Sequence, residues 1–111
     1  MEERERRMGR NEALFREVNE RIERVSGALQ TGTDSMTILC ECGNESCVER
    51  IEVSVSDYER IRKDPKLFFV HSGHAKPEVE TVVEEHEGYD VVRKNSGPAA
   101  DMARELDPRS D

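Results

Sequence analysis

Residues 35–55, SMTILCECGNESCVERIEVSV, hold all three cysteines of the chain between two runs of alternating apolar residues. Side chains of a strand alternate between its two faces, so each run has one apolar face. The residues that share this face are Met36, Ile38, Cys40 and Cys42 before the turn, and Cys47, Ile51, Val53 and Val55 after it. Gly and Asn in the intervening GNES sequence favour a chain reversal. The pattern predicts a β-hairpin with the three thiols near its tip.

Three neighbouring thiols point to a metal site, because structural zinc takes four ligands in a tetrahedron and often uses three Cys and one His. The sulfur ligands would be Cys40, Cys42 and Cys47. The candidates for the fourth ligand, in order of preference, are His74, His71 and His86. His74 comes first because the preceding Gly73 favours a turn that can aim the imidazole. Cys40 and Cys42 are separated by a single residue, so both can bind the same ion only if the strand bends there.

Other roles for the cysteines remain open at this stage. Free structural thiols and a redox switch are the alternatives to a metal site. Three Cys with a His after Ser-Gly also resembles the CDGSH iron–sulfur proteins, which would imply an iron–sulfur cluster. The spacing departs from that family, because the third Cys here is close to the others and the His is distant.

The composition predicts one small domain with a thin core. The chain has 111 residues, of which 34% are hydrophobic and 38% charged. A domain with so little apolar material usually needs a metal, disulfides or a partner subunit. The net charge of −8 argues against nucleic-acid binding, because phosphate backbones are repelled. No apolar run reaches the roughly 18 residues that span a membrane, so we expect a cytoplasmic protein with reduced thiols.

Residues 1–30 form the first predicted unit, an N-terminal amphipathic helix. Its apolar seam is Met8, Phe15, Ile22 and Leu29 at every seventh position, with Asn11, Val18 and Val25 at the complementary positions. We expect this seam to pack on the domain that follows, or to bind a protein partner or a second copy through Phe15, Val18, Ile22 and Val25. Asn11 is a candidate N-cap. Exposed faces are predicted from Glu–Arg pairs four residues apart, namely Glu2–Arg6, Glu3–Arg7, Glu12–Arg16, Glu17–Arg21 and Glu20–Arg24.

Residues 35–107 form the second predicted unit, a small α+β zinc-binding domain. After the hairpin, SDYE predicts a helix capped by Ser56, with Tyr58 and Ile61 facing inward. The segment 66–71, KLFFVH, predicts a buried strand. Residues 77–89 fit both helix and strand, and their valines favour the extended form. A short helix is expected within 96–108. The fold class is therefore α+β.

Several segments together resemble a family of small uncharacterised bacterial proteins, mainly from actinobacteria. These are GRNEALFREVNERIE, CECGNESCVERIEVSVSDYERIRKDPKLFFVHSGH, VVEEHEGYDVVRK and ELDPRS. The resemblance implies that Cys40, Cys42, Cys47 and His74 match family motif positions. It implies no activity, and it favours a free-standing cytoplasmic protein.

These patterns lead to a functional expectation. The chain has no P-loop, dinucleotide-binding loop or nucleophile elbow, so we expect no enzyme. We expect a small zinc-binding protein whose Cys₃His site is structural, acting as a protein-interaction or regulatory module. The alternative is a thiol-based redox or metal sensor.

Overall fold

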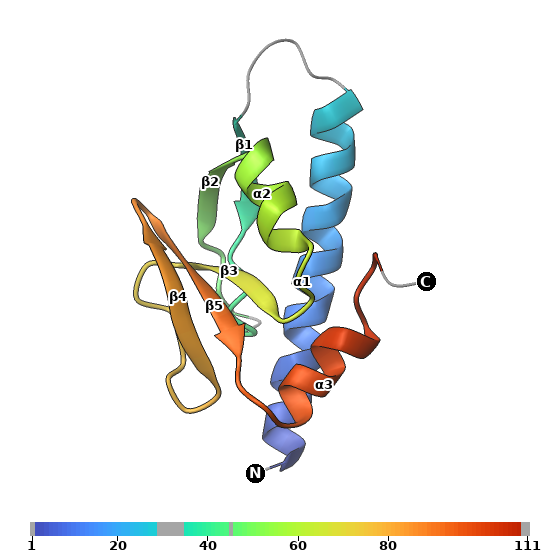
Figure 1. Ribbon diagram of the computed structural model, residues 1–111, viewed down its shortest axis with the longest axis vertical. Coiled ribbons are helices and arrows are strands. Elements are labelled where there is room, and N and C mark those ends of the chain that lie inside the picture. The colour runs from blue at the N-terminus through green and yellow to red at the C-terminus, as the bar shows by residue number, and fades with distance from the viewer. Residues whose placement is uncertain (1, 29–34, 45, 110–111) are drawn as a thin grey trace.

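The structure, a computed structural model, describes residues 2–28, 35–44 and 46–109. The element order confirms the predicted α+β class (Figure 1). The helices and strands are α1 (Glu2–Ala28), β1 (Ser35–Leu39), β2 (Arg50–Ser54), α2 (Val55–Arg62), β3 (Leu67–His71), β4 (Glu80–His86), β5 (Tyr89–Lys94) and α3 (Pro98–Glu105). Leu29 of the predicted seam lies outside the described residues.

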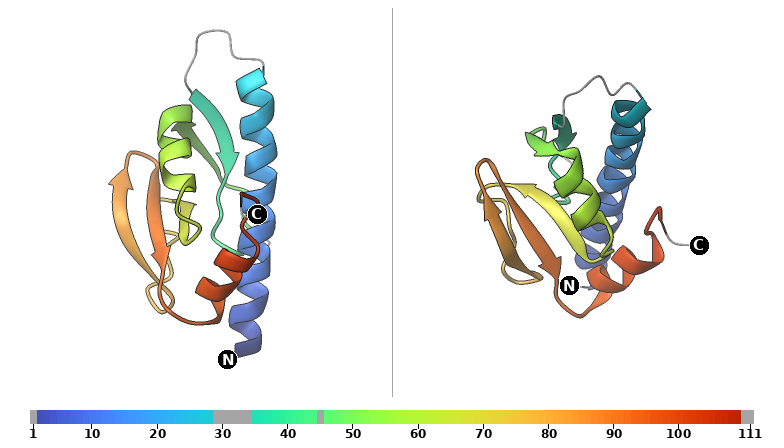
Figure 2. Two further views of the ribbon diagram at one scale, coloured as in Figure 1. Left: turned by 45° about the vertical axis from the view of Figure 1, so that its right-hand side comes forward. Right: turned by 45° about the horizontal axis from the view of Figure 1, so that its top comes forward.

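Two small antiparallel sheets lie beside the long helix α1. The predicted hairpin is present: β1 pairs with β2, and Ile38 lies opposite Ile51. The second sheet has the order β3-β5-β4, and the ambiguous segment 77–89 is mainly extended, because β4 covers Glu80–His86. Figure 2 shows α1 running along the length of the molecule, with α3 beside its N-terminal half. None of the described helices is both long and apolar enough to cross a lipid bilayer.

The core lies between the two sheets and helix α2. Tyr58 and Ile61 of α2 are buried, as predicted. The Tyr58 ring stacks on Phe69 of β3, with centroids 5.4 Å apart and planes inclined by 4°. The remaining buried apolar residues include Met36, Ile38, Ile51, Val53, Phe68, Val70, Val91 and Val92. The expected strand KLFFVH therefore supplies the centre of this core.

Helix α1 buries a polar face, which corrects the expectation of exposed Glu–Arg pairs. The residues it buries include Glu12, Ala13, Arg16, Asn19 and Glu20. Glu12, Arg16 and Glu20 find partners outside α1, and of the predicted pairs only Glu17–Arg21 is seen as an ion pair among the described side chains, at 3.1 Å. The periodicity of apolar residues located the seam. It could not show that the polar side chains next to the seam would be buried and would find hydrogen-bond and ion-pair partners in the interior.

The predicted seam lies on the flank of this buried face. Phe15, Val18 and Ile22 are half-buried, and Ile22 packs against the core. Val25 remains 58% exposed. The seam of α1 therefore packs on its own domain in part and stays accessible in part.

Two predicted helix caps are wrong. Ser54, not Ser56, caps α2, because its side chain accepts a hydrogen bond of 3.1 Å from the backbone N–H of Asp57. The SDYE pattern lies within α2 because the helix begins directly at the end of β2. Asn11 lies inside α1, where its amide donates to the carbonyl of Gly43 at 3.1 Å.

Candidate metal centre

The four expected ligands come from two loops that meet at the end of the β1–β2 hairpin. Strand β1 ends at Leu39 and β2 begins at Arg50, so both strands are shorter than predicted and the cysteines lie in the loop between them. The chain leaves the strand conformation just before Cys40, which meets the condition for two ligands one residue apart. His74 follows Gly73, whose φ of +85° forms the turn after β3.

The side chains of Cys40, Cys42, Cys47 and His74 converge. One ligand atom from each residue can be chosen so that all four lie within 4.8 Å of one another. His74 Nδ1 is 3.5 Å from Cys40 Sγ and 3.7 Å from Cys47 Sγ. With Zn–S near 2.3 Å and Zn–N near 2.0–2.1 Å, a tetrahedron separates a sulfur from a nitrogen by about 3.6 Å. The two observed S–N distances match this separation, so the cluster is compatible with a metal site.

Backbone hydrogen bonds hold the ligand loop in place. The N–H of Cys40 donates to the Glu49 carbonyl at 3.1 Å across the hairpin. The N–H of His71 donates to Cys40 Sγ at 3.2 Å, which is the kind of contact that stabilises a metal-bound thiolate. Lys76 Nζ donates to the Cys42 carbonyl at 2.6 Å. The loop is therefore fixed by neighbours on both sides of the hairpin.

The other two histidines point elsewhere. His71 is half-buried and its Nε2 lies 3.6 Å from a Glu49 oxygen, although its ring lies 5.1 Å from that of His74. His86 stacks on Tyr89 with centroids 4.6 Å apart and contacts Glu84 at 2.7 Å. Among the described residues, His74 is the histidine that joins the cysteine cluster.

The thiols of Cys40 and Cys42 shift each other's pKa in opposite directions. A hydrogen bond from the Cys40 thiol lowers the pKa of Cys42 to about 4. The same hydrogen bond, together with burial, raises the pKa of Cys40. One thiolate thus forms easily, and the second is opposed by the first. A bound cation would offset the repulsion between these two sulfurs.

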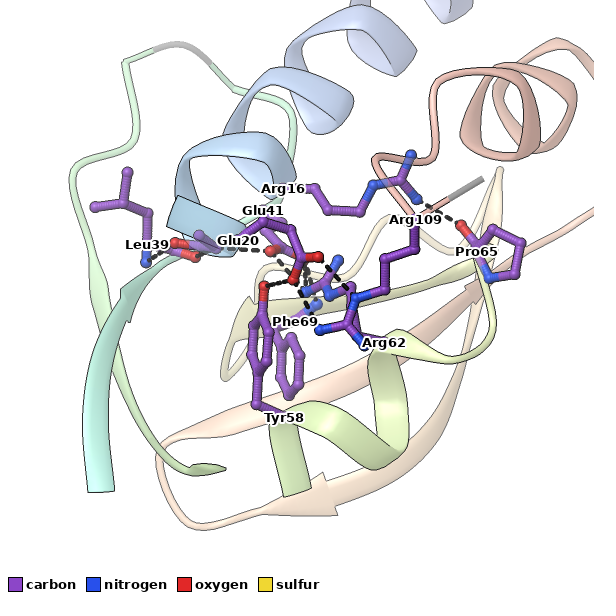
Figure 3. A network of polar contacts seen from close by, with 10 residues as sticks. Arg16, Glu20, Leu39, Glu41, Tyr58, Arg62, Pro65, Phe69 and Arg109 are labelled. Carbon is purple, nitrogen blue, oxygen red and sulfur yellow. Dashed lines mark hydrogen bonds and ion pairs between the residues drawn. The ribbon is translucent and has the colours of Figure 1, made fainter. Parts of the chain in front are cut away.

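A buried ion pair lies directly behind the ligand loop and was not anticipated from the sequence. Glu41, between two of the cysteines, accepts from Arg62 Nη2 at 2.8 Å, and both side chains are fully buried (Figure 3). The N–H of Phe69 and the amide of Asn19 also donate to this carboxylate, at 3.0 and 2.6 Å. The guanidinium of Arg62 lies over the rings of Tyr58 and Phe69, at 4.8 and 5.1 Å.

Polar contacts continue from this ion pair along α1. The Tyr58 hydroxyl donates to Glu20 at 2.7 Å, and Arg109 also binds Glu20, at 2.7 Å (Figure 3). Arg109 binds Glu59 as well, at 2.8 Å. Arg16 donates to the carbonyls of Pro65 and Ala103 at 2.7 and 2.8 Å. No sequence signal identified these residues, because their partners are up to 89 positions away.

A second buried ionic cluster joins α1 to the second sheet. Lys94 Nζ binds the carboxylates of Glu12 and Glu80, and all three side chains are buried. Burial alone lowers the pKa of Lys94, but the two carboxylates outweigh it and raise the pKa overall. The other oxygen of Glu80 accepts from the Lys76 N–H at 2.7 Å, which connects this cluster to the lysine beside Cys42.

The arrangement can bind one metal ion between two loops and leaves no coordination position for a substrate once four protein ligands are used. No family model, curated protein or solved structure matches this chain.

Proposed function

We propose that the chain is a non-enzymatic zinc-binding protein in which Cys40, Cys42, Cys47 and His74 hold one structural Zn²⁺. The observation that carries this proposal is the convergence of four donor atoms within 4.8 Å, with S–N distances of 3.5 and 3.7 Å. Three thiolates and one imidazole form one of the usual ligand sets of structural zinc. Burial of Cys40 and Cys42 supports a structural role, because it restricts access of substrate to the ion.

The same distances favour a single ion over an iron–sulfur cluster. A cluster distributes its protein ligands over two or more iron atoms with bridging sulfides between them, so ligands on different irons lie further apart than ligands of one ion. Thiolate and imidazole ligands in a tetrahedron suit zinc, which has no redox chemistry of its own.

Zinc at this position would stabilise the fold by joining the hairpin loop to the loop after β3. These loops are separated in sequence by the whole of β2, α2 and β3. A core this small gains much of its folding free energy from such a metal. The stabilised domain would present the accessible part of α1 to a protein partner or a second copy. The 58% exposure of Val25 and the equal exposure of Leu14 support this role.

Elemental analysis and thermal unfolding of the untagged protein test the proposal. We expect one zinc per chain and no visible absorbance. Cys42→Ser should lose the zinc and unfold at a lower temperature, whereas Ser46→Ala in the same loop should retain both properties. An unchanged melting temperature for Cys42→Ser would refute the structural role. Iron with visible absorbance would refute zinc as the metal and would point to an electron-transfer or sensing function.

Thiol titration separates a structural site from the alternative of a redox or metal sensor. Thiols that coordinate a structural ion should resist an alkylating reagent until the protein unfolds. Rapid reaction of the native protein, with release of zinc on mild oxidation, would favour the sensor.

A further inference from the structure

The segment that carries the first two cysteines lies against α1 and is bound by two asparagines of that helix. Asn19 Oδ1 accepts from the Leu39 N–H at 2.8 Å, and Asn19 Nδ2 donates to the Leu39 carbonyl at 2.9 Å. Asn11 Nδ2 donates to the Gly43 carbonyl at 3.1 Å. The two contacts lie on either side of Cys40 and Cys42.

The spacing of these contacts matches in the helix and in the segment. Asn11 and Asn19 are eight positions apart, which is about 12 Å along an α-helix. Leu39 and Gly43 are four positions apart, and four residues of chain reach at most about 13–14 Å. The two asparagines can therefore hold both ends of the segment at once.

Gly43 fits closely against the helix. A Cβ at this position would lie 2.7 Å from Met8 Cγ and 2.9 Å from Glu12 Cγ, and the backbone has a φ of +83°. Both features require glycine. The close approach fixes how deeply the segment sits on α1, immediately next to the ligand Cys42.

The docking face of α1 is polar, so these directional contacts matter more than they would on an apolar face. Glu12, Arg16, Asn19 and Glu20 are all buried there. A polar face gains little free energy from burial alone and depends on the geometry of its hydrogen bonds. Displacement of α1 would therefore remove the contacts that set the conformation of residues 39–43.

We propose that α1 is a positioning element of the metal site, and that zinc binding and docking of α1 strengthen each other. This inference rests on the proposed zinc site. Coupling of this kind is reciprocal: zinc holds α1 on the domain, and any partner that draws α1 away weakens zinc binding by the same factor. The consequence is a regulated site, in which a protein that captures α1 promotes release of the ion.

Zinc affinity of the full-length variants, measured by competition with a chromophoric chelator, tests the coupling. Asn19→Ala should weaken zinc binding by about 10- to 100-fold, the range seen when groups that orient metal ligands are removed. Asn11→Ala, which loses a single hydrogen bond, should weaken it by about fivefold or more. Glu17→Ala, on the exposed face of the same helix, should leave the affinity unchanged.

A second control separates positioning from general loss of stability. Val92→Ala destabilises the buried centre of β5, and Val92 belongs to neither α1 nor the ligand segment, so this substitution should weaken zinc binding less than Asn11→Ala. If Asn19→Ala does not fold, Asn11→Ala alone decides. Wild-type affinity in Asn11→Ala, or an equal loss in Val92→Ala, would overturn the coupling while leaving the zinc site intact. A wild-type protein that binds no zinc would overturn both proposals.

Discussion

The buried carboxyl of Glu12 should make the stability of the protein fall as the pH rises through neutrality. Its Oε2 accepts from Lys94, and its Oε1 has no hydrogen-bond partner among the described residues. Burial raises the pKa of Glu12 from 4.5 to about 7, although Lys94 opposes the change. At a pH between these two pKa values, Glu12 keeps its proton in the folded protein and has lost it in the unfolded chain. Glu12 therefore contributes stability at acid pH that disappears above about pH 7.

The size of the effect follows from the two pKa values. Integrating proton binding from about pH 5.5 to about pH 8 gives a loss of about 2 kcal/mol from Glu12 alone. Lys94 does not contribute in this window, because its raised pKa lies above it. The expected change is a substantial fraction of the stability of about 5–15 kcal/mol typical of small domains.

Urea unfolding of the wild type and of Glu12→Gln, both with saturating zinc, measures this contribution. The zinc ligands and the groups distant from Glu12 are common to the two proteins, so subtraction of the two free energies of unfolding isolates Glu12 together with its coupling to Lys94. The difference, wild type minus variant, should decrease by about 2 kcal/mol between about pH 5.5 and about pH 8. A difference that does not vary with pH would refute a raised pKa for Glu12.

Three further tests probe other parts of the fold by urea unfolding at one pH. Gly43→Ala should lower the free energy of unfolding by about 2 kcal/mol or more, because of the positive φ of Gly43 and the overlap of a Cβ with α1. Gly88→Ala has open space around it and should lose only the part that comes from the positive φ. Equal losses in the two variants would contradict the close fit of Gly43 against α1. Arg62→Met should lower the free energy of unfolding by about 3–5 kcal/mol, because it leaves the buried carboxylate of Glu41 without its partner. The double variant Arg62→Met, Glu41→Gln should recover much of this loss. No recovery would argue against a pairwise interaction. Tyr58→Phe should lower the free energy of unfolding by about 1–2 kcal/mol, because it removes the hydrogen bond to the Glu20 carboxylate of α1. An unchanged stability would indicate that this bond contributes nothing.

The local pattern was sufficient to predict the hairpin, the core of α2 and β3, and the clustering of the three cysteines. Met36 and Ile38 alternate with exposed residues, and Tyr58 and Ile61 share one side of a helical turn, so neighbours in sequence contain the information. The cysteines lie within one loop, and Gly73 marks the turn before His74. Proximity of His74 to the cysteines still required the arrangement of β3 beside the hairpin.

The buried charges could not be predicted because their partners are distant in sequence. Glu12 is 82 positions from Lys94, and Arg16 is 87 positions from the carbonyl of Ala103. On a helix, Glu12 and Arg16 look like an exposed pair, and hydropathy assigns them to solvent. Only the tertiary arrangement shows that each finds a better partner in the interior.

The polar face of α1 has a consequence for how the chain is made. Ribosomes synthesise α1 before the residues that it will contact, and Arg109, which binds Glu20, follows 89 residues later. An apolar helix exposed during that interval would attract chaperones or other nascent chains. The docking face of α1 carries Glu12, Arg16, Asn19 and Glu20, so water can hydrate it until the later residues have been synthesised. The same charges that complicate its burial protect it during synthesis.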